Sequence, residues 1–255
     1  MSRRITAGTM RANLFSTENG LAVTAVTVAE MREIDRLAME ELVPSLMQMM
    51  ENAGRNLAEE VMAWTEGRPG LVAALAGSGG NGGGAICGAR HLANHGVETV
   101  VCLSRPAAEL SPAAKEQLAI YRETDGRVID VDEIGELASK VLIDGLLGYS
   151  LRGVPHGETA ALIEWCGRSE AKILSLDVPS GINATTGDAA GAYVRPDRTL
   201  TLALPKTGLA AADTGELVLA DIGIPAGVYA RAGISYRTPF LDGYRVRLVR
   251  TGTMS

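Results

Sequence analysis

Three absences narrow the classes of protein to which this sequence can belong. The 255-residue chain has no apolar run of about 18 residues or more, which excludes a helix that spans a membrane. Its net charge is -6 and no concentrated cluster of lysine and arginine occurs, which argues against a nucleic-acid partner. The three cysteines lack the spacing of metal-ligand motifs, so neither a zinc site nor a catalytic thiol is favoured.

The cysteines also bear on the cellular compartment. Cys87, Cys102 and Cys166 are odd in number, far apart, and placed inside expected helices or strands. Buried, reduced thiols of this kind favour a cytoplasmic location. Hydrophobic residues make up 46% and charged residues 21% of the chain, which is typical of a globular protein with a substantial core.

The chain divides into a short leader and one domain. Residues 1–22 contain three arginines, one acid and no apolar periodicity, which predicts a disordered leader, with a transit peptide as an alternative. No linker-like change of composition interrupts residues 27–225, so we expect a single domain over residues 23–255. Residues after about 225 show no clear pattern, and we expect them to wrap the surface or pair with a partner.

Alternating strand and helix signals predict an α/β fold. A capping box at Thr27 and Glu30 opens an amphipathic helix, and an apolar stripe from Leu46 to Trp64 predicts a second one. Apolar runs then predict strands at 71–76, 97–103, 128–131, 141–144, 172–177, 198–204 and 216–222, and helices from 85 onward and at 111–121, 132–139 and 157–167. Helical crossovers between successive strands imply a largely parallel sheet covered on both faces, with an antiparallel or mixed edge at its end.

A glycine-rich turn follows the first of these strands. Residues 77–84 read GSGGNGGG and lie between an expected strand and an expected helix, where main-chain amides can face an anion. The stretch lacks the GK[ST] ending of a P-loop, and it fits the G-x-G-x-x-G spelling only loosely, through Gly77, Gly79 and Gly82. We predict a phosphate cradle, with a flexible loop as the alternative.

Acidic side chains close two further strands. Asp144 and Asp177 each end an apolar run, where a carboxylate needs donors or a cation. Because parallel strands end on one rim of a sheet, both carboxylates are expected near Asn81 and Ser180. Oxygen ligands of this kind suit a hard cation, and the alternative for each acid is an N-cap or a turn-closing hydrogen bond.

Basic side chains near these loops are weaker candidates. Arg152 lies in a glycine-flanked loop and could clamp a phosphate, with a solvated surface arginine as an equal alternative. Lys206 follows another strand, and we interpret it as a surface lysine in preference to an anion ligand. His91 and His95 are one helical turn apart, but without an HExxH pattern a metal pair is not favoured.

Five motifs in order resemble those of one family. Besides the glycine loop, they are DGLLGYSLRG (144–153), LDVPSGINATTG (176–187), LPKTGL (204–209) and GELVLADIGIP (215–225). The chain resembles the NAD(P)HX epimerase family, also called the YjeF N-terminal domain, from Val26 to about Pro225. The resemblance implies a Rossmann-like three-layer α/β/α sandwich with a mostly parallel central sheet.

The resemblance also implies a function and partners. Members of the family interconvert the R and S forms of NADHX and NADPHX, which are nicotinamide cofactors damaged by hydration of the reduced ring. The implied protein is a homodimer, and a separate NAD(P)HX dehydratase acts in the same repair pathway.

The same resemblance assigns roles to individual residues. Asp177 is the implied acid/base group, and Asn81, Asp144 and Ser180 are the implied ligands of a potassium ion. The residues implied to contact the ligand are Gly80, Asn81, Gly82, Gly83, Gly84, Gly148, Tyr149, Ser150, Leu151, Arg152, Gly153, Val154 and Asp177. The family usually spells its first loop GNNGGDG, so Gly80 and Gly84 here stand where an asparagine and an aspartate are usual.

Two other functions stay open at this point. The missing aspartate at Gly84 leaves a catalytically silent dinucleotide-binding or protein-interaction protein of the same fold as an alternative. A generic Rossmann-like oxidoreductase is disfavoured, because no acid lies about 20 residues beyond the glycine loop to bind a ribose hydroxyl. The nearest acid, Glu98, lies near the start of the next expected strand.

Overall fold

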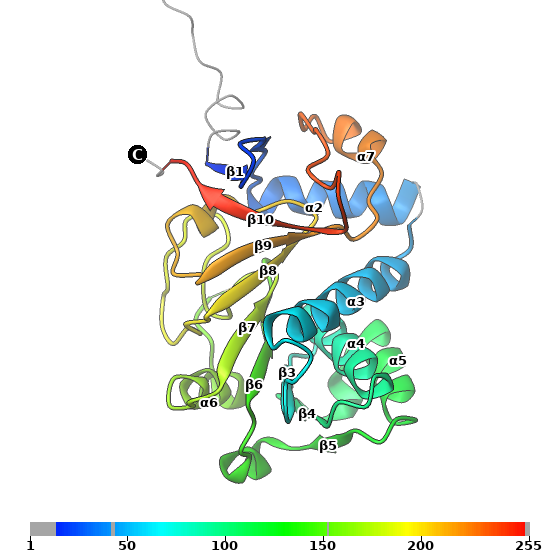
Figure 1. Cartoon of the computed structure of the whole chain (residues 1–255), viewed down its shortest axis with the longest axis vertical. Coiled ribbons are helices and arrows are strands. Elements are labelled where there is room, and N and C mark those ends of the chain that lie inside the picture. The colour runs from blue at the N-terminus through cyan, green and yellow to red at the C-terminus, as the bar shows by residue number, and fades with distance from the viewer. Residues whose placement is uncertain (1–13, 42–43, 152, 253–255) are drawn as a thin grey trace, which may run out of the picture.

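A ten-stranded sheet organises the part of the chain that the structure, a computed structural model, describes: residues 14–41, 44–151 and 153–252 (Figure 1). The strands are β1 (Phe15–Thr17), β2 (Ala22–Val23), β3 (Val72–Ala76), β4 (Thr99–Leu103), β5 (Arg127–Ile129), β6 (Val141–Gly145), β7 (Lys172–Leu176), β8 (Arg198–Leu202), β9 (Glu216–Ala220) and β10 (Arg245–Arg250). The α-helices are α2 (Val28–Arg36), α3 (Leu46–Trp64), α4 (Gly80–Asn94), α5 (Pro112–Tyr121), α6 (Gly157–Cys166) and α7 (Ala226–Arg231). Shorter helical turns are η1 (Leu37–Glu41), η2 (Ala107–Glu109), η3 (Val131–Glu136) and η4 (Thr207–Ala210).

The strand order contains one reversal. Across the sheet the order is β2-β1-β10-β9-β8-β7-β6-β3-β4-β5. Every pair from β9 to β5 is parallel, whereas β10, β1 and β2 add an antiparallel edge. The chain steps outward from β3 to β4 and β5 and then returns to β6 on the other side of β3. Ligands of open α/β sheets bind at such a reversal, beyond the carboxyl ends of the strands.

Helices cover both faces of the parallel part of the sheet. Neighbouring strand residues point to opposite faces, so each strand supplies two cores. On one face Ala74, Ala76 and Val101 pack with α3, α4 and α5. On the other face Ala73 and Leu75 pack with α6 (Figure 1). The predicted three-layer α/β/α sandwich with a mostly parallel sheet is confirmed.

The first long helices begin where their capping residues predict. At the start of α2, the Glu30 main-chain N–H donates to the Thr27 hydroxyl at 3.3 Å, and the Thr27 N–H donates to the Glu30 carboxylate at 2.8 Å. A second capping box, formed by Ser45 and Gln48, opens α3. Cys87, Cys102 and Cys166 are free and buried, as the sequence predicts.

Two predictions about the ends of the chain are wrong. Residues 1–22 were expected to form a disordered leader, yet β1 and β2 lie within or next to this segment. Phe15 is completely buried in a cluster with Leu14, Val23 and Leu248, and this burial holds the segment in the sheet. Residues 1–13 of the expected leader lie outside the described residues. Beyond residue 225, the expected irregular segment contains α7 and β10.

The far end of the sheet also differs in detail from the prediction. An antiparallel or mixed edge was expected at the end of the strand series, yet its last two predicted strands, β8 and β9, are parallel and the connection between them contains η4. The antiparallel edge comes from β10, β1 and β2 instead. The helix expected at residues 132–139 is the short 3₁₀ turn η3.

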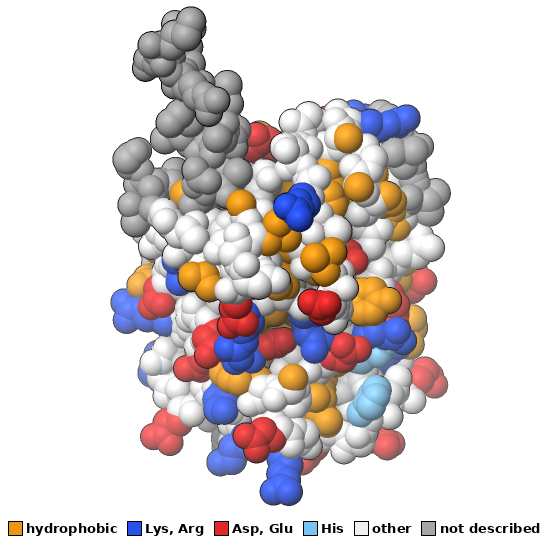
Figure 2. Space-filling model, turned by 45° about the horizontal axis from the view of Figure 1, so that its top comes forward, with side chains coloured by type: hydrophobic (Ala, Val, Ile, Leu, Met, Phe, Trp, Pro, Cys, Tyr) orange, Lys and Arg blue, Asp and Glu red, His pale blue; other side chains and the backbone are white. Residues whose placement is uncertain are grey.

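Two observations concern membrane-spanning helices and the charge of one face of the molecule. Among the described residues, no helix is both long enough and apolar enough to cross a membrane. On the face shown in Figure 2, acidic and basic side chains are interspersed, and its described residues do not gather into one broad basic patch.

Helix α4 approaches the strand ends more closely than a side chain would permit. A β-carbon on Gly82 would lie 1.8 Å from the carbonyl oxygen of Gly77, and one on Gly77 would lie 1.9 Å from that of Leu146. A β-carbon on Gly145 would lie 2.3 Å from the Ala85 side chain. These glycines are therefore required by packing, and they bring the first turn of α4 against the loops after β3 and β6.

This packing predicts that two alanine substitutions in helix α4 differ in their effect on the free energy of unfolding. Gly82→Ala should lower the free energy of unfolding by about 3 kcal/mol, because its β-carbon overlaps main-chain atoms that cannot move independently. Gly80→Ala is the matched control: its β-carbon meets no atom within 4 Å, so stability should stay unchanged or rise slightly through helix propensity. Urea unfolding of the two variants measures both effects, and equal midpoints would contradict the packing argument.

Candidate functional site

A cavity of about 700 Å³ lies at the reversal between β3 and β6. This volume is in the usual range of small-molecule sites. The residues that follow β3, β4, β6 and β7 line it together with apolar side chains, among them Met39, Met49 and Met50. The sheet topology therefore places the cavity where the glycine loop and the loop after β6 face each other.

Asp177 lies in this cavity, directly after β7, in a strained backbone conformation. Its φ angle is 68°, a left-handed value that costs a residue with a side chain about 1–2 kcal/mol. The conformation is held by a main-chain hydrogen bond to the carbonyl of Leu200 at 2.8 Å. The carboxylate accepts a hydrogen bond from the Tyr149 main-chain N–H at 3.0 Å and forms an ion pair with Lys206.

The interpretation of Lys206 as a surface lysine is wrong. Its side chain is 1% exposed and lines the cavity. The ammonium group contacts the Asp177 carboxylate, donates to the carbonyl of Leu202 at 2.9 Å, and lies 5.6 Å from the centre of the Tyr149 ring. The signal was present in the sequence, since Lys206 follows β8 and β8 neighbours the strand that ends at Asp177.

A second acid faces the same cavity from helix α2. The Tyr149 hydroxyl donates a hydrogen bond to the carboxylate of Asp35, which is 114 residues away in the sequence. Burial raises the pKa of Asp35, and the Tyr149 hydrogen bond opposes that shift. Burial, reinforced by the charge of Asp35, raises the pKa of Tyr149, so its phenol keeps its proton. Tyr149 belongs to a recognisable motif in the sequence, whereas Asp35 is one of several polar residues on an amphipathic helix and carries no such signal.

Asp144 is completely buried at the end of β6 and accepts four hydrogen bonds. The donors are the Ser175 hydroxyl at 2.7 Å, the Ser180 N–H at 2.9 Å, the Ser180 hydroxyl at 2.5 Å and the Leu146 N–H at 3.3 Å. Burial raises the pKa of the Asp144 carboxyl, while these donors oppose the shift. Among the described residues, no lysine or arginine forms an ion pair with Asp144.

Asn81 joins this cluster from the first turn of α4. Its side-chain amide donates to the carbonyls of Leu147 at 3.0 Å and Leu176 at 3.1 Å. The Leu147 N–H donates in turn to the Ser180 hydroxyl at 2.8 Å. The structure thus brings Asn81, Asp144 and Ser180 together at the ends of three neighbouring strands, and their role as cation ligands stays a prediction.

The other residues predicted to bind the ligand fall into three groups. Those that line the cavity are Gly80, Asn81, Gly84, Gly148, Tyr149, Ser150, Leu151, Val154 and Asp177. Gly82 and Gly83 are buried against Gly77 and Met50, and Gly153 occupies the loop with a φ of 73°. Arg152 lies outside the described residues, so its role as a phosphate ligand stays a prediction.

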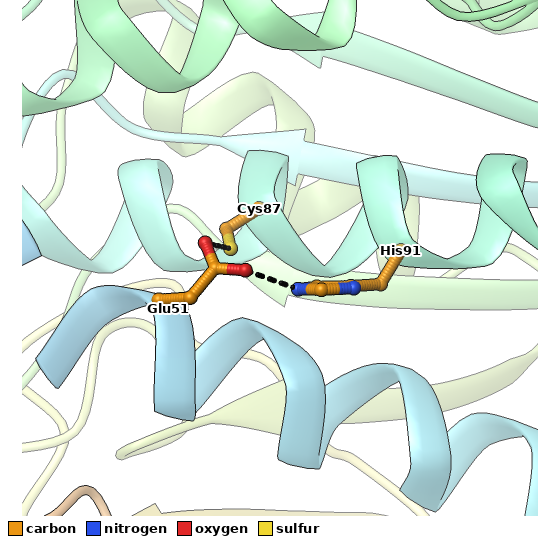
Figure 3. Close-up of side chains that lie close together, drawn as sticks. All are labelled: Glu51, Cys87 and His91. Carbon is orange, nitrogen blue, oxygen red and sulfur yellow. Dashed lines mark hydrogen bonds and ion pairs between the residues drawn. The ribbon is translucent and has the colours of Figure 1, made fainter. Parts of the chain in front are cut away.

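A further polar cluster lies between α3 and α4 (Figure 3). The Glu51 carboxylate lies 2.8 Å from the His91 ring and accepts a hydrogen bond from the Cys87 thiol at 3.4 Å. Arg90 places a guanidinium nitrogen 2.5 Å from Glu51 and 3.3 Å from the Cys87 sulfur. The Arg90 guanidinium therefore balances the charge of the Glu51 carboxylate in this cluster. The His95 ring contacts the main-chain carbonyl of His91 instead of the other ring.

Comparisons with known proteins cover the same motifs. The family model described as YjeF-related protein N-terminus matches residues 46–208. This range is more than half of the chain, and it contains the glycine loop, Asp144, Asp177 and Lys206.

Several curated relatives are similar over most of this chain. The NAD(P)H-hydrate epimerase of Dehalogenimonas lykanthroporepellens is 51% identical over 239 residues, which are 92% of this chain and 96% of the relative. The NAD(P)H-hydrate epimerase of Rhodopirellula baltica is 36% identical over 80% of this chain and 86% of its own length. The bifunctional NAD(P)H-hydrate repair enzyme Nnr of Hyperthermus butylicus is 40% identical over 86% of this chain, and the match spans only 42% of that longer relative.

A solved structure supports the fold. The crystal structure of yeast ynu0, YNL200c, matches with a TM-score of 0.74 over 89% of this chain and 100% of the yeast chain, at 21% sequence identity. The family model thus covers more than half of the chain, and one relative is 51% identical over 92% of it. The chain belongs to the family of YjeF-related protein N-terminal domains.

Proposed function

We propose that this chain is an NAD(P)H-hydrate epimerase, which interconverts the R and S forms of NADHX and NADPHX in nicotinamide-cofactor repair. The observation that carries the proposal is the buried pair of Asp177 and Lys206 in a cavity beside the glycine loop. The relatives from D. lykanthroporepellens and R. baltica, which carry this name, support it.

The reaction needs one acid/base group at the altered ring carbon. That carbon bears a hydroxyl group and the ring nitrogen, so it can invert by ring opening or by loss and return of water. In the second route, the acid/base group in its protonated form passes its proton to the hydroxyl, water leaves as the C–O bond breaks and the nitrogen lone pair moves into a C=N bond, and water then adds to the opposite face. The added water then returns a proton to the base.

Asp177 is the residue proposed to carry this proton. Its carboxylate faces the cavity, and the strained backbone and the Tyr149 N–H fix its position. Lys206 is proposed as the positioning residue, because its ammonium group holds one carboxylate oxygen and compensates the buried charge. The loop from Gly148 to Val154 is proposed to hold the dinucleotide phosphates. It begins close to the proposed catalytic residue, since a β-carbon on Gly148 would lie 3.3 Å from both Asn81 and Asp177.

A potassium ion fits the cluster around Asn81. The oxygen atoms of this cluster are the Ser180 hydroxyl and the carbonyls of Leu147 and Leu176, and the Asn81 amide lies against both carbonyls. Asp144 is completely buried and forms no ion pair with a described lysine or arginine, so a monovalent cation beside it would stabilise its carboxylate. We assign Asn81, Asp144 and Ser180 as the residues that would hold potassium, which when bound would supply a fixed positive charge next to the ligand.

The remaining assignments concern the cellular setting. A separate NAD(P)HX dehydratase is proposed to act in the same pathway, a proposal supported by the bifunctional names of the longer relatives. Free, buried cysteines support a reducing, cytoplasmic location. The homodimer rests on the family resemblance.

A catalytically silent ligand-binding protein is the second candidate. The feature that favours it is Gly84, which lines the cavity at a position where the family resemblance implies an aspartate. The two candidates share the same cavity and differ only in turnover.

The proposed function predicts turnover and a strong dependence on one acid/base group. The purified protein should accelerate the approach of R-NADPHX to equilibrium with the S form, followed by chromatography. Asp177→Asn should lower this rate at least about a hundredfold, because the proton carrier is lost. Asp242→Asn, an exposed acid that does not line the cavity, is the matched control and should keep the full rate. A wild-type rate equal to the spontaneous one, with ligand still bound, would favour the silent protein.

The second prediction concerns potassium. At constant ionic strength, the melting temperature should be higher in potassium chloride than in lithium chloride, since a ligand of the folded state stabilises it. Ser180→Ala should abolish this difference between the two salts. Ser175→Ala also removes a hydrogen bond to Asp144 but no proposed potassium ligand, so its salt dependence should persist. A difference that survives in Ser180→Ala would argue against the assigned site.

The third prediction separates the two candidate functions. Gly84→Asp should change the epimerase rate less than tenfold if Asp177 and Lys206 suffice for catalysis. The new β-carbon would lie 3.0 Å from a terminal methyl carbon of the buried Leu176 side chain, so this side chain has to shift slightly to accept it. A large gain in rate from a nearly inactive wild type would instead support the silent protein.

A further inference from the structure

We infer that Ser104 and Arg105 form a subsite for the phosphate on the adenine ribose, so that the chain prefers NADPHX to NADHX. Both residues follow β4 and line the same cavity as Asp177. The inference rests on the proposed function, because it specifies which dinucleotide the epimerase takes.

The order of groups along the rim of the sheet sets the direction of the ligand. The strands β7, β6, β3 and β4 are consecutive neighbours, and their carboxyl ends carry Asp177, the loop 146–154, the glycine loop and Arg105, in this order. If the nicotinamide ring binds at Asp177 and Lys206, the two linking phosphates bind at the loop 146–154 and at the glycine loop. The adenine ribose is then left for the end at β4.

The distances along this rim suit an extended dinucleotide. Neighbouring strands lie about 4.8 Å apart, so three steps separate the ends of β7 and β4 by roughly 14 Å. This is the scale on which such a cofactor separates its nicotinamide ring from its adenine ribose. Arg105 therefore lies at the distance where the ribose substituent of NADPHX, a phosphate monoester, differs from the hydroxyl of NADHX.

The segment that carries Arg105 is fixed by main-chain contacts. The Ser104 N–H donates to the carbonyl of Ala76 at 3.0 Å, next to the glycine loop, and the Ser111 N–H donates to the carbonyl of Ser78 at 2.8 Å. Pro106 follows Arg105 and restricts its backbone to extended conformations. Arg105 therefore lies in a segment fixed by main-chain hydrogen bonds, next to the glycine loop that is proposed to face the ligand.

The charge at this position favours a phosphate over a hydroxyl. In dinucleotide-binding folds an acid after the second strand accepts hydrogen bonds from the ribose hydroxyls, whereas an arginine accommodates the extra phosphate. Here the position holds a serine and an arginine, and the next acid is Glu109, which does not line the cavity. Arg105 is exposed and forms no ion pair with another described residue, so its guanidinium is available to a dianion.

The test compares the two substrates in three proteins. The wild-type kcat/KM should be higher for R-NADPHX than for R-NADHX. Arg105→Ala should lower kcat/KM about tenfold for R-NADPHX, the loss of one charge-assisted contact, and leave R-NADHX unchanged. Arg122→Ala, an exposed arginine that does not line the cavity, is the matched control and should change neither value.

A binding measurement makes the outcome independent of turnover. By calorimetry, 2′-AMP should bind the wild type more tightly than 5′-AMP does, and Arg105→Ala should remove this difference. An equal loss for both dinucleotides would show that Arg105 contacts the linking phosphates, and no loss for either would remove it from the site; both results overturn the inference. If the wild type turns over neither substrate but retains the 2′-AMP preference, the subsite stands and the proposed function fails.

Discussion

The close approach of helix α4 to the ends of β3 and β6 is the constraint on which the rest of the site depends. Gly77, Gly82 and Gly145 remove the side chains that would otherwise keep the helix away. The first turn of α4 can then place the Asn81 amide against the carbonyl of Leu147, after β6, and that of Leu176, at the end of β7. The Asn81 side chain therefore joins the start of α4 to the ends of two neighbouring strands beside the cavity.

Two acids that line the cavity, Asp35 and Asp177, and the completely buried Asp144 are each stabilised in a different way. Asp144 is satisfied by four hydrogen bonds, Asp177 by a lysine, and Asp35 by a tyrosine hydroxyl. Burying a carboxylate is costly unless donors or a counter-charge accompany it, so these partners decide what each acid can do. Asp144 accepts a hydrogen bond from the main chain after β7 and does not line the cavity, whereas Asp177 combines a counter-charge with access to the cavity.

Local patterns in the sequence were sufficient to predict most of the parallel sheet. Apolar runs mark its strands, and the residues that follow them belong to the rim, because parallel strands end on the same side. This reasoning located Asn81, Asp144, Asp177 and Ser180. It missed Asp35, because a polar residue on an amphipathic helix carries no signal that it faces a cavity formed by distant loops.

Lys206 and the edge strands were missed for different reasons. Lysine is usually exposed, so its burial becomes evident only when β8 is placed beside β7. Strands β1 and β2 are three and two residues long, too short to show an alternating pattern. The two strands are held in the sheet by the burial of Phe15 and by the pairing of β1 with β10. A local window of sequence contains neither contact.

The pairing of β1 with β10 also constrains how the protein can fold. Phe15 lies opposite Arg250, so β1, near the start of the described residues, can pair only after β10, near their end, is available. Contacts between such distant segments form slowly, because a very long loop must close first. The parallel sheet and its cavity contain none of these residues and can assemble earlier. On the ribosome, the antiparallel edge is therefore the last part of the sheet to close, and until then β9 presents an unpaired edge to other chains.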